Sequence, residues 1–443
     1  MAGIHVALNA AEYGTMVYLI DDTASIGGIM ARLDKTFPTN DCSICIEAPR
    51  MYEVDNNENI EILTNTEVRR ITRKDDGFTV RLLKKAKFID EEKCTGCGAC
   101  AQACPMTVPD EMDGKIGGTR KLISMPFPQA VPSSVAVDKR CRDGKMRANG
   151  ACIGGCVVDC SQCRECPIAL CVKACIKEGK DAVRLWQADK QMDLEVKSIV
   201  VASGLNPDEP EDGQYGYNVY ENVITNLQFE RLMNAGGPTG GNIIRPSDKH
   251  HPKKIAWIQC VGRGLKEGEV HYCSKVCCMI AAKQTIITKE HGPDVETIVF
   301  YNDLKAYGKG FWGFYKKAVE HGVKYVRARP HDVREDPDTK NLFVKYEDLD
   351  TGELKEEEVA LLVLSMGLVS GNRNRKLAKA LGLELDNHGF FKEKDPIMHP
   401  LETNVEGIYL CGGATSPIDI SESVIQASAA ALRAVSNNSE VAK

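Results

Sequence analysis

Residues 94–105 read CTGCGACAQACP, so that Cys94, Cys97, Cys100 and Cys104 are followed directly by Pro105. In bacterial ferredoxins, thiolates with this C-x2-C-x2-C-x3-C-P spacing hold a 4Fe–4S cluster. A structural zinc site can also use a C-x2-C pair, but the complete spacing with its proline favours the cluster. The run therefore predicts electron-transfer chemistry.

The run lies in a cysteine-rich block, residues 88–181, which contains twelve of the nineteen cysteines. We interpret the block as an inserted two-cluster ferredoxin domain, in which the fourth cysteine of each run ligates the other cluster. The best match to a second run comprises Cys163, Cys166, Cys171 and Cys175. Cys141, which lies upstream of this run, is the candidate distal ligand. Cys152, Cys156 and Cys160 are left over, and they either hold a third cluster or are alternates. At least two clusters are expected here.

Upstream of this block, residues 3–21 have the pattern of the second half of a dinucleotide-binding βαβ unit. An apolar helical stripe follows Gly3, residues 16–20 read as a buried strand, and Asp21 closes the strand. In such units an acidic residue about 20 positions past the glycines binds the ribose hydroxyls. Gly3 then corresponds to the third glycine of G-x-G-x-x-G. Taken alone, the pattern fits an ordinary amphipathic helix before a strand nearly as well.

Two later segments complete the pattern of an FAD site. Residues 199–204 read as an apolar strand that ends in small residues, and residues 407–413 read as another, followed by a helix predicted over 423–434. In two-domain flavoproteins of the disulfide-reductase type, these places and the first βαβ turn form one FAD site. The acid usual after the late strand is absent here. The candidate FAD-binding residues are Gly3, Asp21, Gly27, Gly28, Ala202, Ser203, Gly204, Gly412 and Gly413.

A second βαβ unit is predicted from a strand over 254–259, a helix over 274–289 and a strand over 296–301. In a pyridine-nucleotide oxidoreductase, its first turn would carry the glycines that bind the NAD(P)H phosphates. Instead, a C-x12-C-x3-C-C pattern starts at the end of the strand and continues on the helix: Cys260, Cys273, Cys277 and Cys278. We infer a further thiolate-held cluster in place of the nicotinamide. The alternative is four buried structural cysteines.

With these motifs in place, the chain resembles the A-type component of heterodisulfide reductase. The resemblance rests on residues 27–46, 126–132, 238–241 and 258–262 and on the C-x12-C-x3-C-C pattern, and it extends over nearly the whole chain. It implies an α/β fold: a two-domain FAD/NAD(P)-binding Rossmann core of the thioredoxin-reductase type with an inserted ferredoxin domain. The expected ranges are 1–87 for the first part of the FAD-binding domain, 88–181 for the insert, 182–385 for the return strand and second Rossmann-like domain, and 386–443 for the closing part.

The same resemblance implies an oxidoreductase component with FAD and 4Fe–4S clusters in a cytoplasmic complex of anaerobic metabolism. Its expected partners are B- and C-type heterodisulfide reductase components, a hydrogenase or formate dehydrogenase module, and ferredoxin. Electrons would pass through the clusters and FAD to a disulfide reductase module or ferredoxin, with flavin-based bifurcation in some members. An NAD(P)H-dependent iron–sulfur flavoprotein, a quinone-linked member of the same family and a non-enzymatic electron carrier without FAD are the alternatives.

The chain departs from this resemblance at both ends, because the family generally has a further N-terminal region and a C-terminal ferredoxin domain. We therefore expect a truncated gene product or a fragment. Cys42 and Cys45 are further metal-ligand candidates, since they could share a cluster with that N-terminal region. They could equally form a redox-active dithiol. Lys305 and Lys309 either stabilise a reduced flavin or belong to a solvated basic loop.

Composition excludes several other classes. The net charge is -6, from 56 basic and 62 acidic residues, and does not indicate a basic surface for binding nucleic acid. The longest apolar run, residues 359–369, is too short for a membrane span and is expected to be a buried strand. No secretory pattern opens the sequence, so we expect reduced cysteines in the cytosol that bind metal rather than form a disulfide framework.

Overall fold

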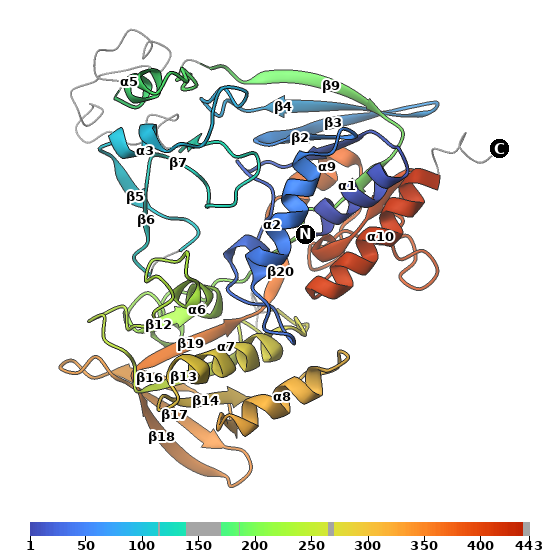
Figure 1. Cartoon of the computed structure of the whole chain (residues 1–443). Helices are drawn as coiled ribbons and strands as arrows, with labels where there is room; N and C mark the ends of the chain where they lie inside the picture. Colours follow the sequence, from blue (N-terminus) through green and yellow to red (C-terminus); the bar gives the residue numbers. More distant parts are fainter. Residues whose placement is uncertain (114–115, 139–169, 186, 265–269, 437–443) are drawn as a thin grey trace.

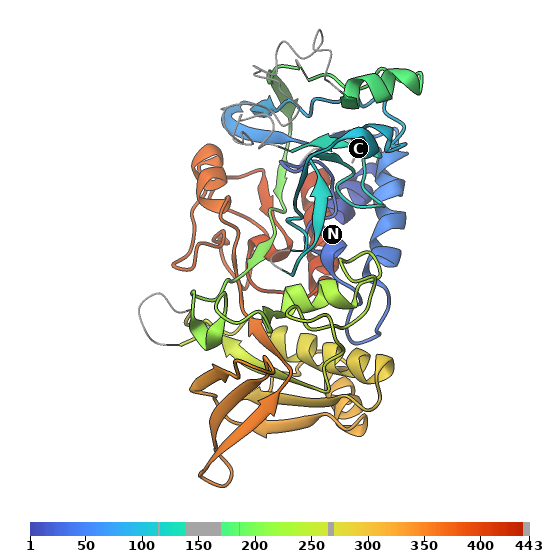
Figure 2. The same ribbon diagram turned by 90° about the vertical axis from the view of Figure 1, so that its left-hand side faces the viewer.

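The computed structural model describes residues 1–113, 116–138, 170–185, 187–264 and 270–436. Two α/β lobes lie one above the other in Figure 1, and the cysteine-rich insert lies beside the first lobe at the upper left and extends down toward the second lobe. The turned view in Figure 2 again has the insert at the top and the second lobe at the bottom. Within the described ranges, no helix has the length and apolar character needed to cross a bilayer.

The first lobe is built from two pairs of parallel strands and the helices that cover them. Strand β1 (Val17–Ile20) pairs with β2 (Ile60–Leu63), and β10 (Ile199–Val201) pairs with β21 (Ile408–Leu410). Helices α1 (Ala2–Glu12), α2 (Ser43–Asp55) and α10 (Ile420–Ser436) pack alongside. Small residues let α10 approach α1 closely, because Ala427, Ala430 and Ala431 share one buried cluster with α1.

An antiparallel sheet joins the first lobe to the insert. Its order is β3 (Thr66–Lys74), β4 (Gly77–Lys84) and β9 (Lys190–Val196). The chain enters the insert after β4 and returns in β9, and the register pairs Lys84 with Lys190. The two ends of the insert therefore lie side by side. The insert contains α3 (Ala99–Ala103), β5 (Thr107–Pro109), β6 (Thr119–Lys121), β7 (Ile123–Ser124), β8 (Ala136–Val137) and α5 (Leu170–Lys177).

The second lobe has a five-stranded parallel sheet in the order β12, β19, β13, β14, β15. These strands are Val223–Thr225, Leu361–Met366, Lys254–Val261, Glu296–Tyr301 and Lys324–Arg327. Helices α6 (Asn226–Met233), α7 (Cys277–His291) and α8 (Phe311–Glu320) cover one face, and a meander of β16 (Asp332–Glu335), β17 (Leu342–Asp348) and β18 (Glu353–Val359) covers the other. Alternate residues of a strand point to opposite faces. Accordingly, Ile255 and Trp257 pack toward the helices, whereas Ala256 and Ile258 pack toward the meander.

Short elements connect the lobes. Strand β11 (Leu205–Pro207) pairs with β20 (Leu368–Ser370), and α9 (Asn374–Leu381) follows β20. Helix α9 contributes Ala378 and Leu381 to the core of the first lobe. The domain boundary predicted at residue 385 stays a prediction, and the packing of α9 favours one before residue 374. Short 3-10 turns lie at Met30–Arg32, Gln214–Gly216 and Gly412–Ala414.

Two predicted elements differ from the observed ones. The helix predicted over 274–289 begins only at Cys277, so Cys273 lies in the preceding loop and not on the helix. Lys275 has a φ of 52°, a left-handed conformation that interrupts a helix at this point. The apolar run 359–369 is divided among the end of β18, β19 and β20 rather than forming one strand.

Candidate functional site

The predicted FAD residues converge only in part, at the first turn of α1. A Cβ atom on Gly3 would lie 3.5 Å from that of Ala202, and one on Gly412 would lie 2.7 Å from that of Ala2. The start of α1 is thus enclosed by the ends of β10 and β21, and no side chain caps it. A helix start with free N–H groups favours a phosphate, so these residues fit the pyrophosphate of a dinucleotide.

The other FAD candidates lie in the first lobe, and their hydrogen bonds and backbone conformations differ. Asp21 directly follows β1, and its Oδ1 atom accepts hydrogen bonds from the backbone N–H and the hydroxyl of Thr23, at 2.8 and 2.6 Å. Ser203 donates a hydrogen bond to Asn374 at 2.8 Å. The remaining candidates, in turns of the first lobe, are Gly27, Gly28, Gly204 and Gly413. The first three of these have positive φ.

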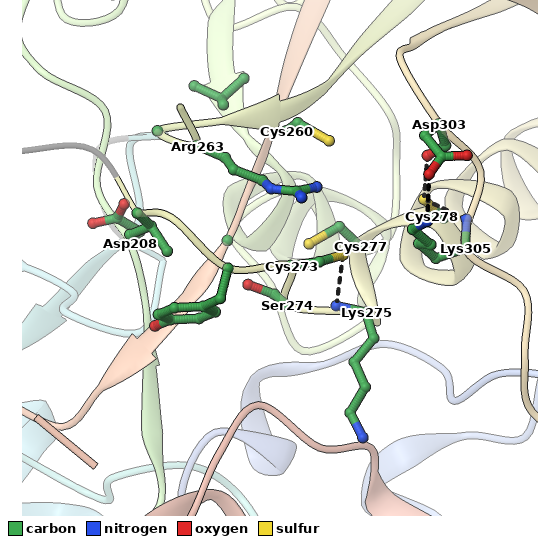
Figure 3. A pocket seen from close by; sticks show the side chains of 15 residues that line it. Asp208, Cys260, Arg263, Cys273, Ser274, Lys275, Cys277, Cys278, Asp303 and Lys305 are labelled. Carbon is green, nitrogen blue, oxygen red and sulfur yellow. Dashed lines mark hydrogen bonds and ion pairs between the residues drawn. The ribbon is translucent and has the colours of Figure 1, made fainter. Parts of the chain in front are cut away.

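The C-x12-C-x3-C-C cysteines all line one pocket of the second lobe (Figure 3). Cys260 comes from the end of β13, where the register against β19 shifts between Ile258 and Val261. A bulge of this kind redirects a side chain, and Cys260 has a φ of 61°, a strained conformation for a residue with a Cβ atom. The bulge thus lies at the carboxyl end of the strand, where Rossmann-type sheets bind cofactors.

The other three thiols are held by backbone contacts around the start of α7. The backbone N–H of Lys275 donates to Sγ of Cys273 at 3.4 Å, and Sγ of Cys277 donates to the carbonyl of Met366 at 3.3 Å. Cys278 accepts from the N–H of Lys305 at 3.4 Å. Figure 3 shows Cys278 beside Asp303 and Lys305, and Cys273 and Cys277 nearer to Cys260.

Lys305 and Lys309, which are predicted either to lie beside a flavin or to belong to a solvated loop, lie in different surroundings. Lys305 lines the pocket and pairs with Asp303. Lys309 is exposed to solvent. The pairing of Lys305 with Asp303 favours a role at the thiol pocket over one beside the flavin.

Burial makes these thiols hard to ionise. It raises the pKa of Cys278 to about 11 and raises the pKa of Cys277 further. Burial also raises the pKa of Cys260, which the Arg263 guanidinium partly opposes. Metal binding displaces such protons and stabilises the thiolates. Four cysteine sulfurs around one pocket are the donor set that a 4Fe–4S cubane requires, so the residues fit this group.

The insert brings together the described cysteines of the two runs. Cys100 and Cys104 share a buried cluster with Cys175, and Cys94 and Cys171 pack against it. Burial raises the pKa of Cys100 to about 12, and the nearby thiol of Cys175 contributes to this rise. Burial likewise raises the pKa of Cys171 to about 11, and there the nearby thiol is that of Cys104. This packing of α3 against α5 fits the exchange of fourth ligands that a two-cluster ferredoxin requires, and the ligand assignment stays a prediction.

Cys97, the remaining described cysteine of the insert, is exposed. The other predicted or left-over cysteines lie outside the described residues: Cys141, Cys152, Cys156, Cys160, Cys163 and Cys166. In the described part of the chain, no three His, Cys, Asp or Glu side chains are grouped as ligands of a single metal ion.

Cys42 and Cys45 form a disulfide at the start of α2. Cys42 is the N-cap residue, and its sulfur accepts a hydrogen bond from the N–H of Cys45 at 3.3 Å. Neither residue belongs to the buried clusters that contain the other cysteine groups. The structure thus favours the dithiol interpretation of this pair, and the ligand interpretation stays a prediction.

Sequence reasoning missed a buried polar network between the lobes. The ammonium of Lys283 on α7 donates to Glu230 on α6 at 2.8 Å and to the carbonyl of Lys35 at 2.7 Å. Glu230 also accepts from Gln284 and from the backbone N–H of Asp34. The sequence does contain one indication of this network, which is Lys283 within the apolar run MIAAKQTII. A single charged residue on a buried helix face requires a partner of opposite charge or a hydrogen-bond acceptor.

Comparison with known proteins agrees with these features. Residues 87–108 match the 4Fe–4S binding domain family. The chain is 45% identical, over 97% of its length, to the A-type iron–sulfur component of the CoB–CoM heterodisulfide reductase of Methanocaldococcus jannaschii. It is 44% identical, over the same share, to the A-type component of the H2/formate:CoB–CoM heterodisulfide,ferredoxin reductase of Methanococcus maripaludis. In each comparison it spans 62% of the relative's length.

Among solved structures, the thioredoxin reductase of Lactococcus lactis aligns with a TM-score of 0.51 at 13% identity, over 99% of this chain and 96% of that one. This alignment confirms the predicted fold class. The chain therefore has the two-domain fold of thioredoxin reductases and is similar, over nearly its whole length, to the A-type components of heterodisulfide reductases.

Proposed function

We propose that this chain is the FAD- and iron–sulfur-containing electron-transfer part of a heterodisulfide-reductase-type complex. It passes electrons from a partner hydrogenase or dehydrogenase, through 4Fe–4S clusters and FAD, to a disulfide reductase module, to ferredoxin, or to both by flavin-based bifurcation. The observation that carries this proposal is the pocket of four thiols at the carboxyl end of β13. A pyridine-nucleotide oxidoreductase would keep phosphate-binding glycines at that position.

Each cofactor has a set of proposed ligands. FAD is held around the start of α1 and the ends of β10 and β21, and the cofactors themselves carry the redox chemistry. In the insert, the proposed ligands are Cys94, Cys97, Cys100, Cys104, Cys171 and Cys175, with Cys141, Cys163 and Cys166 completing two clusters. A further cluster is held by Cys260, Cys273, Cys277 and Cys278.

The proposed partners follow from the names of the relatives. These names mention H2 or formate together with CoB–CoM heterodisulfide and ferredoxin. We therefore propose B- and C-type heterodisulfide reductase components, a hydrogenase or formate dehydrogenase module and ferredoxin as partners, in the cytoplasm. The same thiols would serve a quinone-linked complex equally well, and the acceptor must be identified in the isolated complex.

The cluster assignment is tested by iron and sulfide analysis of the full chain purified without oxygen. The variant Cys277→Ser should lose about four irons and four sulfides per chain relative to the unmodified protein. Cys411→Ala is the matched control, because Cys411 is buried but belongs to no predicted cluster. Equal iron in the two variants would show that the four thiols are only structural.

The choice of electron donor is tested on the flavin. NADH or NADPH should leave the flavin absorption unchanged under anaerobic conditions, whereas a low-potential one-electron donor should bleach it. Bleaching by either nucleotide would favour the NAD(P)H-dependent alternative. Iron and sulfide without bound flavin would favour an electron carrier that lacks FAD.

A further inference from the structure

A short segment before α7 carries Cys273 and lies between the two lobes. The ring of Tyr272, which also lines the pocket of four thiols, packs edge-on against His388 and Phe390, with ring centroids 4.7 and 5.9 Å apart. These two residues directly precede Phe391 in the core of the first lobe. One side of the thiol pocket is therefore in contact with the lobe that carries the candidate FAD residues.

Lys275 makes a second contact across the lobes from the same segment. Its ammonium donates to both carboxylate oxygens of Glu422 on α10, at 2.9 and 2.8 Å, and Figure 3 shows its side chain extending away from the thiols. The backbone N–H of Lys275 donates to Sγ of Cys273 at 3.4 Å. With a φ of 52°, Lys275 has a conformation that persists only where the surroundings fix it. One residue thus joins a candidate cluster ligand to the first lobe.

The carboxylate of Glu422 is itself held in place beside the candidate FAD site. The N–H of Glu422 donates to the side chain of Asp419 at 2.8 Å, and the N–H of Asp419 donates to Glu422 at 3.1 Å, which is a reciprocal cap of α10. The next residue, Ser423, lies near Gly412: a Cβ atom on Gly412 would be 3.9 Å from Oγ of Ser423 and 2.7 Å from Cβ of Ala2. The first turn of α10 therefore borders the start of α1, where FAD is proposed to bind.

The exposure of this ion pair argues against a role in stability alone. The side chains of Lys275 and Glu422 are 24% and 42% exposed, and pairs that water can screen contribute little to the free energy of folding. The lobes are also joined by the buried ion pair of Lys283 and Glu230 and by the contact of Lys283 with the carbonyl of Lys35. What the pair of Lys275 and Glu422 adds is the position of the thiol-bearing segment relative to α10.

From these contacts we propose that Lys275 and Glu422 are a positioning pair for electron transfer between the pocket of four thiols and FAD. This role rests on the function proposed above. The pair holds the segment that carries Cys273 against the first turn of α10, and so fixes the separation between the cluster and the flavin. Each electron that passes oxidises the cluster by one electron and reduces the flavin by one. No bond between the two forms or breaks, and the flavin takes its protons from solvent.

The first test is the rate at which the flavin is reduced. The full chain with its bound cofactors is mixed without oxygen with a reduced bacterial-type ferredoxin, and loss of the flavin absorption is followed by stopped flow. In Lys275→Met this rate should fall at least about tenfold, because a misplacement of about 1 Å can cost about a hundredfold where a reaction depends on position. Iron, sulfide and flavin contents should equal those of the unmodified protein. An unchanged rate would overturn the proposal, and so would loss of iron, which would make the pair a structural support of the pocket.

A matched control lies on the same helix. Arg433, near the other end of α10, pairs with Glu402 inside the first lobe, so Arg433→Met should leave the rate unchanged. Lys275→Arg keeps a cation opposite Glu422 and should restore most of the rate. Equal slowing in Arg433→Met and Lys275→Met would mean that loss of any ion pair on α10 has this effect, and would contradict the proposed role.

A double-variant cycle tests whether the two residues act as a pair. Glu422→Gln removes the charge but keeps the cap of α10, because glutamine can also accept from the N–H of Asp419. Its rate should fall as far as that of Lys275→Met, and the double variant should be no slower, since both changes remove the same interaction. A double variant that shows the product of the two single effects would mean that the residues act separately, which excludes a positioning pair.

Cys277→Ser separates failure of this proposal from failure of the proposed function. This variant is expected to lack the cluster in the pocket, so its flavin should be reduced more slowly than that of the unmodified protein. If the two proteins react at the same rate, electrons bypass the pocket, and the proposed route and the positioning role are both wrong. If Cys277→Ser is slow while Lys275→Met reacts like the unmodified protein, only the positioning role is wrong.

Discussion

Lys283 and Glu230 form an ion pair with each side chain only 2% exposed, at the contact between α7 and α6. Removal of one partner leaves the other charge buried and unpaired, which typically costs about 3–5 kcal/mol. We therefore expect Lys283→Met to lower the free energy of unfolding by about that amount in urea titrations. Lys324→Met is the control, because the ion pair of Lys324 with Glu357 lies at the surface and is worth at most about 1 kcal/mol. Similar losses in the two variants would contradict this account.

Asp34 makes stability depend on pH. Burial, and then the nearby carboxylate of Glu230, raises the pKa of Asp34 to about 6 in the folded protein, from 3.8. Between these two values the unfolded chain has lost the proton and the folded chain keeps it, so folding takes up a proton and stability falls as the pH rises. Asp34→Asn should therefore gain stability relative to the unmodified protein as the pH is raised from about 4 to about 7, the window between and just above these two pKa values. Unfolding titrations at both ends measure the change, and a constant difference would contradict it.

At the thiol pocket, Gly262 is required for two reasons. Its φ is 78°, and a Cβ atom would lie 2.8 Å from a carboxylate oxygen of Asp208. Gly262→Ala should destabilise the protein by about 1–3 kcal/mol and reduce the iron held in the pocket. Gly213→Ala is the matched control, since Gly213 has a φ of 86° but open space around its Cα atom. If both variants lose the same stability, the contact with Asp208 has no effect.

At the scale of single elements, α2 depends on its first residue. The sulfur of Cys42 is the side-chain cap of this helix. In the reduced protein, Cys42→Ala should lose about 1 kcal/mol more of unfolding free energy than Cys42→Ser, because alanine cannot accept the N–H. Thermal unfolding under reducing conditions compares the two. An equal midpoint would mean that the cap contributes nothing.

Part of the second lobe was predictable, because its central strands are short apolar runs bounded by turn residues. The strand predicted over residues 296–301 has the observed limits of β14. The conformation around the thiols was not predictable. The bulge that turns Cys260 and the left-handed Lys275 arise from long-range packing against β19 and from the ion pair of Lys275 with Glu422 on α10. Spacing identified the four cysteines, whereas tertiary contacts determine how they meet.

At the scale of the whole molecule, the insert is tied to the second lobe by Arg231 on α6. Its guanidinium donates to Asp113 at 2.8 Å, and both side chains are buried. Arg231→Met leaves the carboxylate of Asp113 without this partner. We expect faster proteolysis within the insert than in the unmodified protein, with the rate elsewhere unchanged. Gel analysis of limited tryptic digests measures it, and uniform acceleration would indicate general destabilisation.

The pairing of Lys84 with Lys190 has a consequence for how such a protein could be taken apart. The chain leaves the sheet and returns to it at adjacent positions, so the intervening segment could be exchanged for a tight turn without separating β4 from β9. A shortened chain of this kind would keep the strand pairing at the junction. It would have to replace two buried contacts of the insert, that of Val131 in the core of the first lobe and that of Asp113 with Arg231.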